Sequence, residues 1–190
     1  MTDQKCYIEF EISNELNFND LKEIFDKIKE AKNTGQPKSD QFWLDSFPKY
    51  SIEEFYFGEN DLKPDFPTSD LNEFTWHFYS LTSLLQTDYD IEYLNCFKQS
   101  DKVGTIDYNP FNYPYGGITG LIVFIKSFNC RPTMIDDGTG LYSITFLNNG
   151  DFSIADINNP NRPDSSKKRF DGLQLIRDFI NRINKKNYGS

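Results

Sequence analysis

The sequence contains few of the residues that most catalytic and metal-binding sites need. It has one histidine, His77, together with three cysteines and two methionines among 190 residues. Cys6, Cys96 and Cys130 lack the paired spacing of a zinc site, and their odd number disfavours a disulfide framework. We therefore expect three buried, reduced thiols.

Long apolar runs are also missing. No run approaches the roughly 18 residues that a membrane-spanning helix needs. The first twelve residues, MTDQKCYIEFEI, lack the basic and then apolar pattern of a signal peptide. These absences predict a cytoplasmic protein with no membrane partner.

Positive charge is scarce in the middle of the chain. Residues 40–92 include 12 Asp or Glu and 2 Lys, a balance of −10, whereas residues 161–190 include 8 Lys or Arg and 3 Asp, a balance of +5. The whole chain carries a net charge of −9. Because phosphates would be repelled across most of such a surface, a nucleic acid is disfavoured as the main ligand. The acidic middle suits a basic protein partner better.

Aromatic side chains and one apolar stretch dominate what is present. The 18 Phe, 11 Tyr and 2 Trp residues predict a largely aromatic core. Residues 118–128 follow helical spacing and are apolar on most sides, which indicates a helix buried on most of its circumference. A buried strand fits the same run, but its length and the preceding Gly116 and Gly117 favour the helix. A short strand, 131–135, and a turn, 136–140, are predicted to follow.

Periodicity predicts the other elements. Strands are expected at 6–12, 52–57, 91–97, 103–108, 142–147 and 152–157, the last two joined through a tight turn at Asn149-Gly150. A first helix is expected from a cap at Asn19 or Asp20 to about residue 33, and a second, short helix just before Pro48. A last helix is expected at 170–185, after a polar loop at 158–168. Residues 73–85 fit a strand or a helix, with the helix favoured. This order predicts a single α+β domain over residues 1–190, with a mainly antiparallel sheet packed against three to five helices.

Three features have the composition of a chemical site. His77 would serve as a general base, but no nucleophile motif accompanies it. Asp107, Asp136 and Asp137 flank the central helix and would suit magnesium or calcium, although Asp-Gly-Thr-Gly is also an ordinary turn. The glycines of Tyr115-Gly116-Gly117 precede a helix as in a phosphate-binding loop, but the Lys and Ser or Thr of such a loop are missing. For each feature, the structural interpretation is favoured.

The strongest functional signal is a stretch where acidic and aromatic residues alternate. Aromatic anchors with an acidic rim are typical of an interface for a basic protein, and the charges would speed encounter. The alternative is that the rings fill the core while the acids keep the protein soluble. The residues predicted to contact a partner are Asp40, Trp43, Asp45, Glu53, Glu54, Tyr56, Glu59, Asp61, Asp65 and Trp76.

A small acidic domain of this type resembles the immunity proteins that are encoded beside bacterial polymorphic or contact-dependent toxins. The resemblance lies in size, charge, the aromatic acidic stretch and the expected lack of an export signal. It implies a non-catalytic, cofactor-free inhibitor that covers the active site of a cognate, basic protein toxin. Two other functions stay open: a metal-dependent hydrolase that uses Asp107, Asp136 and Asp137 with His77 in support, and an intracellular scaffold or regulatory protein.

Overall fold

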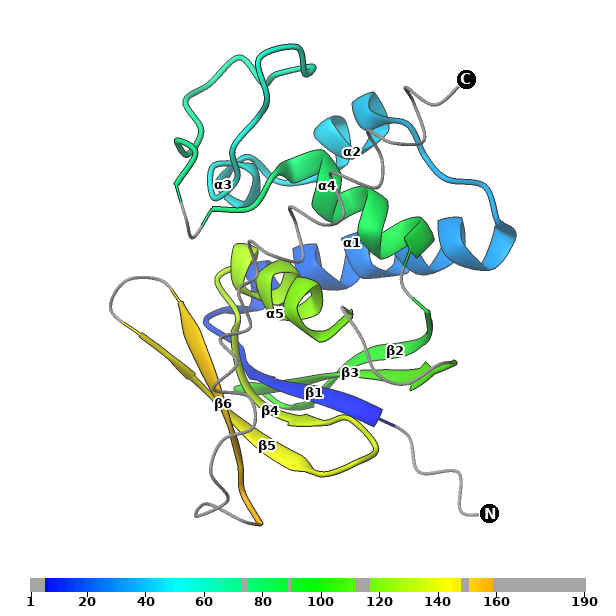
Figure 1. The fold of residues 1–190 in the computed structure, drawn as a ribbon, viewed down its shortest axis with the longest axis vertical. Helices are drawn as coiled ribbons and strands as arrows, with labels where there is room; N and C mark the ends of the chain where they lie inside the picture. Colours follow the sequence, from blue (N-terminus) through cyan, green and yellow to red (C-terminus); the bar gives the residue numbers. More distant parts are fainter. Residues whose placement is uncertain (1–5, 73–74, 89, 112–116, 148–150, 159–190) are drawn as a thin grey trace, which may run out of the picture.

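A six-stranded antiparallel sheet forms the base of the molecule (Figure 1). The computed structural model describes residues 6–72, 75–88, 90–111, 117–147 and 151–158. The strand order is β2-β3-β1-β4-β5-β6. The bounds are β1 (Cys6–Glu11), β2 (Ile91–Ser100), β3 (Val103–Pro110), β4 (Arg131–Asp136), β5 (Leu141–Phe146) and β6 (Phe152–Asp156). The predicted α+β class with an antiparallel sheet is confirmed.

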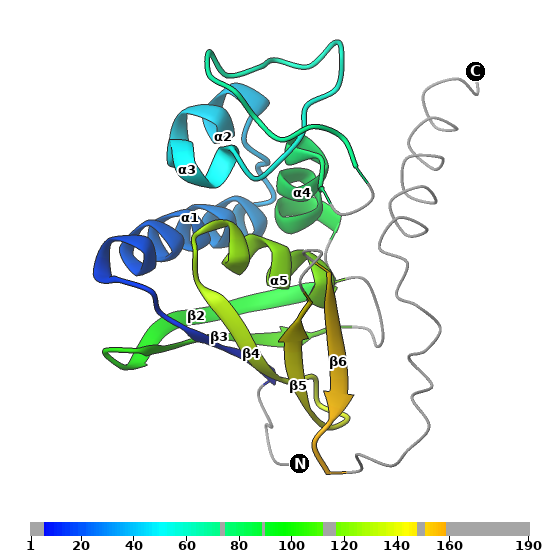
Figure 2. The same cartoon turned by 90° about the vertical axis from the view of Figure 1, so that its left-hand side faces the viewer.

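The helices lie on one side of this sheet in two layers (Figures 1 and 2). The layer next to the sheet contains α1 (Glu15–Thr34) and α5 (Gly117–Ser127). Above it lie α2 (Asp40–Ser46), α3 (Lys49–Ile52) and α4 (Phe78–Ser83), which continues into a turn of π-helix, η1 (Leu84–Asp88). We call α2, α3, α4 and the segment 53–77 between α3 and α4 the cap. Among the described helices, none is both long and apolar enough to cross a membrane.

The central strand β1 shows how the sequence pattern places the sheet. Ile8 and Phe10 are fully buried beneath the helices, while Tyr7 and Glu9 alternate with them and point to the other face. The Phe10 ring lies over Gly104 of β3, where an added Cβ would come within 2.4 Å of two ring carbons. Only glycine fits at that position, so Gly104 allows Phe10 to close the core over β3.

The long helix α1 begins earlier than its pattern predicts. The side chain of Asn14 caps it by accepting a hydrogen bond from the Asn17 amide at 3.0 Å, and Gly35 ends it with a φ of 62°. The predicted cap at Asn19 or Asp20 is therefore wrong. The buried Phe18 belongs to the apolar face and extends the helix by more than a turn at its N-terminus.

The apolar stretch 118–128 forms a buried helix, as predicted, and connects the base to the cap. Phe124 and Phe128 point toward Phe47, which follows α2, with ring centroids 6.3 and 5.6 Å away. Phe47 also contacts Phe78 of α4 at 5.1 Å. This aromatic cluster joins α2, α4 and α5 into one core.

Two predicted elements of the cap differ from the structure. The predicted strand 52–57 is wrong: its first residue ends α3, and only Tyr56 forms a single parallel bridge, to His77. Within 73–85 the favoured helix is confirmed only from Phe78 onward. The turn at Asn149-Gly150, the helix 170–185 and the loop 158–168 beyond Asn158 lie outside the described residues.

Candidate partner-binding surface

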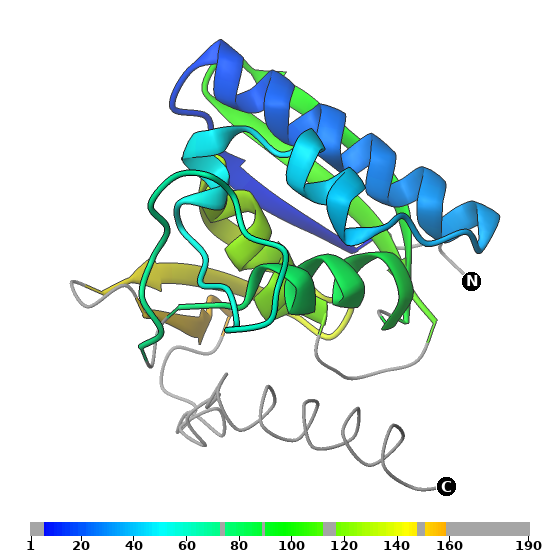
Figure 3. The ribbon, with the colours of Figure 1, turned by 90° about the horizontal axis from the view of Figure 1, so that it is seen from above.

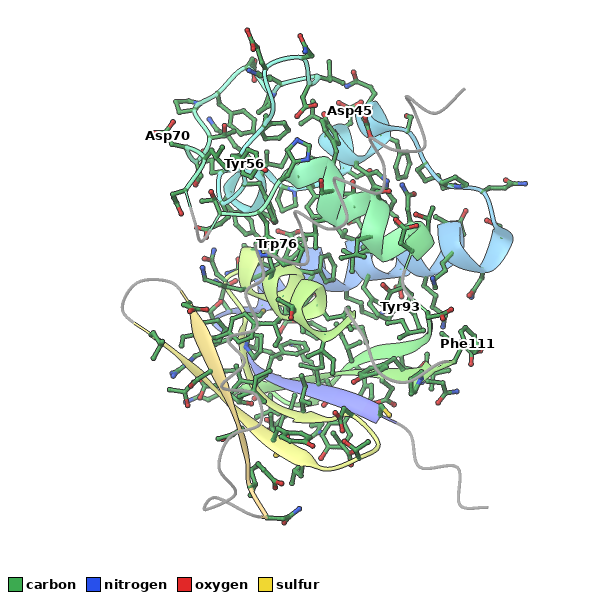
Figure 4. All side chains as sticks on the ribbon, in the orientation of Figure 1. Asp45, Tyr56, Asp70, Trp76, Tyr93 and Phe111 are labelled. Carbon is green, nitrogen blue, oxygen red and sulfur yellow. The ribbon has the colours of Figure 1, made fainter. Side chains whose placement is uncertain are left out.

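The acidic residues predicted to contact a partner come from α2 and from the segment 53–77 of the cap, which Figure 3 shows from above. Figure 4 labels one of them, Asp45 on α2. Between residues 40 and 83 the described chain carries eight Asp or Glu residues and two lysines. Six of the seven acidic residues predicted to touch a partner are exposed: Asp40, Asp45, Glu53, Glu54, Glu59 and Asp65. Glu54 forms a long ion pair of 3.7 Å with Lys126 of α5, whereas the carboxylates of Glu53, Glu59 and Asp65 have no partner within the described residues.

The predicted aromatic anchors lie deeper than the acids. Trp43 has no exposed surface and packs edge-on against Phe42 and Phe47, at 5.1 and 6.2 Å, so no partner can touch it. It belongs to the core, because helix α2 turns that side inward. Tyr56 and Trp76 are half-buried, and the Tyr56 amide donates to the Trp76 carbonyl at 3.0 Å. They join the two ends of the segment 53–77 and leave only part of their rings accessible.

His77 connects this segment to the start of α4. Its Nε2 lies 2.5 Å from Oδ2 of Asp61, and its Nδ1 accepts the Ser80 amide at 3.2 Å, which makes it the N-cap of the helix. The same Asp61 oxygen accepts the Gly58 amide at 2.5 Å. A neutral ring that donates from Nε2 and accepts at Nδ1 satisfies all these contacts. Asp61 is therefore engaged inside the cap, with 26% of its side chain exposed.

The Ser80 hydroxyl lies 2.9 Å from Nδ1 of His77 and completes a serine–histidine–carboxylate chain. Such a chain activates a nucleophile when the imidazole is free to take the hydroxyl proton. Here the Nδ1 lone pair also receives the Ser80 amide. The arrangement thus serves first to cap α4 and to hold Asp61.

Other hydrogen bonds hold the segment 53–77 at several points. The amide of Ser69 donates to the carbonyls of Glu53 and Phe55, both at 3.1 Å, and its hydroxyl donates to the Glu53 carbonyl at 2.9 Å. The Tyr79 hydroxyl donates to the Leu62 carbonyl at 2.6 Å. Segments this long without regular structure are commonly functional loops. In residues 53–72 of this one, hydrogen bonds hold the backbone near residues 53–58, 61, 62 and 69.

Ionisation in the cap reflects its negative field. Partial burial of its carboxylate, and then the neighbouring Asp61, raise the pKa of Asp40 above its usual value. Burial raises the pKa of Tyr79 to about 12, and Asp40 and Asp61 act in the same direction. The pKa of Tyr56 is also raised above its ordinary value, first by burial and then by Asp61. A cation that approaches the cap would offset the repulsion between these negatively charged groups.

The alternative metal ligands lie elsewhere, on and after the sheet. Asp107 on β3 and Asp136 on β4 are both register partners of Tyr7 on β1, so they face away from the helices. Asp137 accepts the amides of Thr139 and Gly140 at 2.8 and 3.2 Å, while Asp136 accepts that of Gly138 at 2.9 Å. These bonds form the predicted turn. No group of three His, Cys, Asp or Glu side chains among the described residues is arranged to hold a metal ion.

A shallow cavity of about 490 Å³ lies between the end of α1 and the start of β2, and the predicted contact residues do not line it. Burial lowers the pKa of Lys32 there, although Asp90 and Asp88 oppose that change. The residues around it include Lys32, Gln86, Asp90, Glu92 and Phe111.

The sequence pattern did not indicate the link between His77 and Asp61, because the two residues are 16 positions apart in an irregular segment. Comparisons of the chain with protein-family models, with curated proteins and with solved structures find no match. The functional argument therefore depends on the geometry of the described residues.

Proposed function

We propose that this protein is a non-catalytic inhibitor that binds a basic protein toxin through the acidic surface of the cap, as an immunity protein does. The observation that supports this proposal most is the set of carboxylates on Glu53, Glu59 and Asp65. They are exposed and without partners within the described residues, on a segment whose backbone is held by internal hydrogen bonds. An ordered loop loses little conformational entropy on binding, so more of the interaction energy becomes affinity.

The charge of the cap also indicates how binding would proceed. Eight acidic residues against two lysines attract a basic surface from a distance and raise the association rate constant. If the toxin is a nuclease, its phosphate-binding cleft would meet carboxylates in place of phosphates. Covering that cleft would inhibit the toxin without any chemical step by the inhibitor.

The test compares two variants that change the charge equally on different surfaces. The first is Glu53→Lys with Asp65→Lys in the cap; the control is Asp88→Lys with Asp101→Lys, two exposed residues outside it. The binding partner is the toxic C-terminal domain encoded by the neighbouring gene. We expect the cap variant to associate at least about ten-fold more slowly at low salt, and the control to stay close to the unmodified protein.

Two results would contradict the proposal. If the cap variant and the control associate equally fast, the cap is not the contact surface. If the neighbouring gene encodes no toxic domain, or that domain kills cells with and without this protein equally, the immunity function is rejected. Thermal unfolding of both variants shows whether any loss of binding comes from unfolding.

A further inference from the structure

The β5–β6 hairpin carries a row of apolar side chains on the side of the sheet that points toward the helices. Ile135 on β4 is the register partner of the buried Ile8 on β1 and of Tyr142 on β5, so these three residues share that side. Strand alternation and register then assign the other residues. We call this side of the two strands the inner hairpin face; its residues are Tyr142, Ile144, Phe146, Phe152, Ile154 and Asp156.

The inner hairpin face is less well covered than the rest of the sheet. Helix α1 contacts β2 and α5 contacts β4, but no described helix packs to the same extent against β5 or β6. Seen from above, α1 lies over the part of the sheet away from the hairpin (Figure 3). Ile8 and Phe10, beneath the helices, have no exposed surface, whereas Phe146, Phe152 and Ile154 are only half-buried. The hairpin thus keeps apolar side chains partly in water.

The two sides of the hairpin differ as in strands that are covered on one side. Within β5 and β6, the outward positions between the inner residues hold only Ser143, Thr145, Ser153 and Ala155. On the inner side, the rings of Phe146 and Phe152 contact each other at 5.9 Å and pack at the margin of the core. Such alternation is typical of antiparallel strands with one packed face. One more helix in the layer of α1 and α5 would complete the burial of these rings.

The chain contains a segment with the pattern of such a helix. In the helix that the sequence predicts at 170–185, one side is apolar and consists of Leu173, Ile176, Phe179, Ile180 and Ile183. The opposite side is polar and includes Gln174, Arg177, Asn181, Asn184 and Lys185. A helix of about 16 residues is about 24 Å long, which exceeds the length of the five-residue strand β6 at about 3.3 Å per residue. An amphipathic helix has to bury its apolar side against another element.

The position of this segment in the chain favours the inner hairpin face as its site. Strand β6 ends at Asp156, and residues 159–169, which precede the predicted helix, span up to about 36 Å when extended. Because the segment is joined to the hairpin, its effective concentration there is on the order of millimolar, and a second copy would have to compete with it. Charge acts in the same direction: residues 161–190 carry +5, whereas the whole chain carries −9.

We propose that residues 170–185 form a helix that packs its apolar side on the inner hairpin face, beside α5. The apolar side covers Phe146, Phe152 and Ile154, while Arg177 and Lys185 stay in water. This helix is then the third in the layer next to the sheet, where α1 contacts β2 and α5 contacts β4. The inference is independent of the proposed toxin binding, because the cap takes no part in the contact.

The test attaches a nitroxide to the variant Gln174→Cys of the full chain and records its amide NMR signals. The three native thiols are buried, so the new thiol on the polar side is the one labelled in the folded protein. We expect the label to broaden the signals of Phe146, Phe152 and Ile154, and to leave those of β2, at the opposite edge of the sheet, sharp. The broadening should persist when this protein is diluted with an excess of unmodified protein without isotope, because the contact lies within one chain.

Two double variants separate the apolar side from a general effect of charge. Ile176→Asp with Ile180→Asp places two carboxylates on the apolar side, whereas the matched control, Asn181→Asp with Asn184→Asp, adds the same charge to the polar side. We expect the first to abolish the broadening and to raise amide hydrogen exchange in β5 and β6 by about ten-fold or more, and the control to change exchange less than about two-fold. Unchanged exchange in β1 and β3 shows that the sheet is still folded.

Four results would overturn the inference. If the hairpin signals stay sharp, the segment does not lie on this face. Broadening that disappears on dilution would show that a second copy covers the hairpin. Broadening at Glu59 and Asp65 instead of the hairpin would place the segment on the cap. Equal effects of the two double variants would indicate attraction by charge alone. The nitroxide experiment needs neither double variant, so it decides the question even if one of them fails to fold.

Discussion

At the scale of single residues, burial changes the acidity of the three cysteine thiols. All three are buried, and burial is the largest cause that raises the pKa of Cys6 to about 11, of Cys96 to about 12 and of Cys130 to about 11. A thiol in the unfolded chain ionises near pH 9. Between pH 9 and about 12 the native state therefore binds more protons than the unfolded state, and the free energy of unfolding falls as the pH rises.

We expect Cys96→Ala to isolate this effect. The variant is less stable at pH 8 because it loses buried contacts. Its deficit relative to the unmodified protein should shrink above pH 9, at most by about 1.4 kcal/mol per pH unit. Urea unfolding at pH 8, 9, 10 and 10.5 in the presence of a reductant measures the deficit. A deficit that stays constant over this range would show that the thiol ionises equally in both states.

The residue scale also shows what the sequence predicted about the candidate site. The sequence predicted that seven acidic residues of the cap would be accessible to a partner, and six of them are exposed. It did not distinguish Trp43, which fills the core, from Tyr56 and Trp76, which keep part of their rings accessible. Burial of a ring depends on which turn of a short helix faces the neighbouring layer. In a seven-residue helix such as α2, periodicity contains too few positions to decide this.

At the scale of elements, the segment 53–77 has the structure that was hardest to predict. Phe55 and Phe57 alternate with Glu54 and Tyr56 like a strand, but the described backbone bonds of Phe55 and Tyr56 go to Ile52, Ser69, Trp76 and Phe78 instead of to a sheet. The Phe55 carbonyl accepts the Ser69 amide, for example. Regular elements such as β1, α5 and the β5–β6 hairpin were predictable because their patterns repeat over several residues. The neighbouring positions of Asp107, Tyr7 and Asp136 could not be predicted, because these residues lie on separate strands that only the register brings together.

The His77 ring makes two contacts, one with Asp61 and one with the Ser80 amide at the start of α4, and different substitutions can remove them separately. Asn at its position can still cap α4, but it is too short to reach Asp61, whereas Ala loses both contacts. We expect His77→Asn to raise amide hydrogen exchange in residues 58–72 by about five- to thirty-fold, which corresponds to the loss of about 1–2 kcal/mol of local stability. Exchange in α4 should stay close to that of the unmodified protein.

The variant His77→Ala is the comparison for this experiment. It should raise exchange both in residues 58–72 and in α4, because the Ser80 amide loses its acceptor. Hydrogen-exchange mass spectrometry resolves the two peptides. Unchanged exchange in residues 58–72 of the Asn variant would show that Asp61 does not need the imidazole to hold the segment.

At the scale of the whole molecule, the cap and the sheet are joined by one continuous hydrophobic core. The cap and the sheet share no strand, so their connection depends on helices α1 and α5 and on the rings around Phe47 (Figure 1). Phe47 is 4% exposed and contacts rings from α2, α4 and α5. Packing of this kind makes neighbouring layers unfold together. A rigid cap would then depend on the base for its order.

This arrangement predicts that the described domain unfolds in one transition. Both tryptophans, Trp43 and Trp76, belong to the cap, so their fluorescence reports on the cap while far-UV circular dichroism reports on all elements. We expect the two urea midpoints to coincide in the unmodified protein. Phe47→Ala should lower the free energy of unfolding by about 3–5 kcal/mol and move the fluorescence transition to lower urea. The control Ile144→Ala on β5 should move the fluorescence and circular dichroism transitions to lower urea by the same amount. If the fluorescence midpoint of the unmodified protein already lies at lower urea than the circular dichroism midpoint, the cap unfolds independently of the sheet.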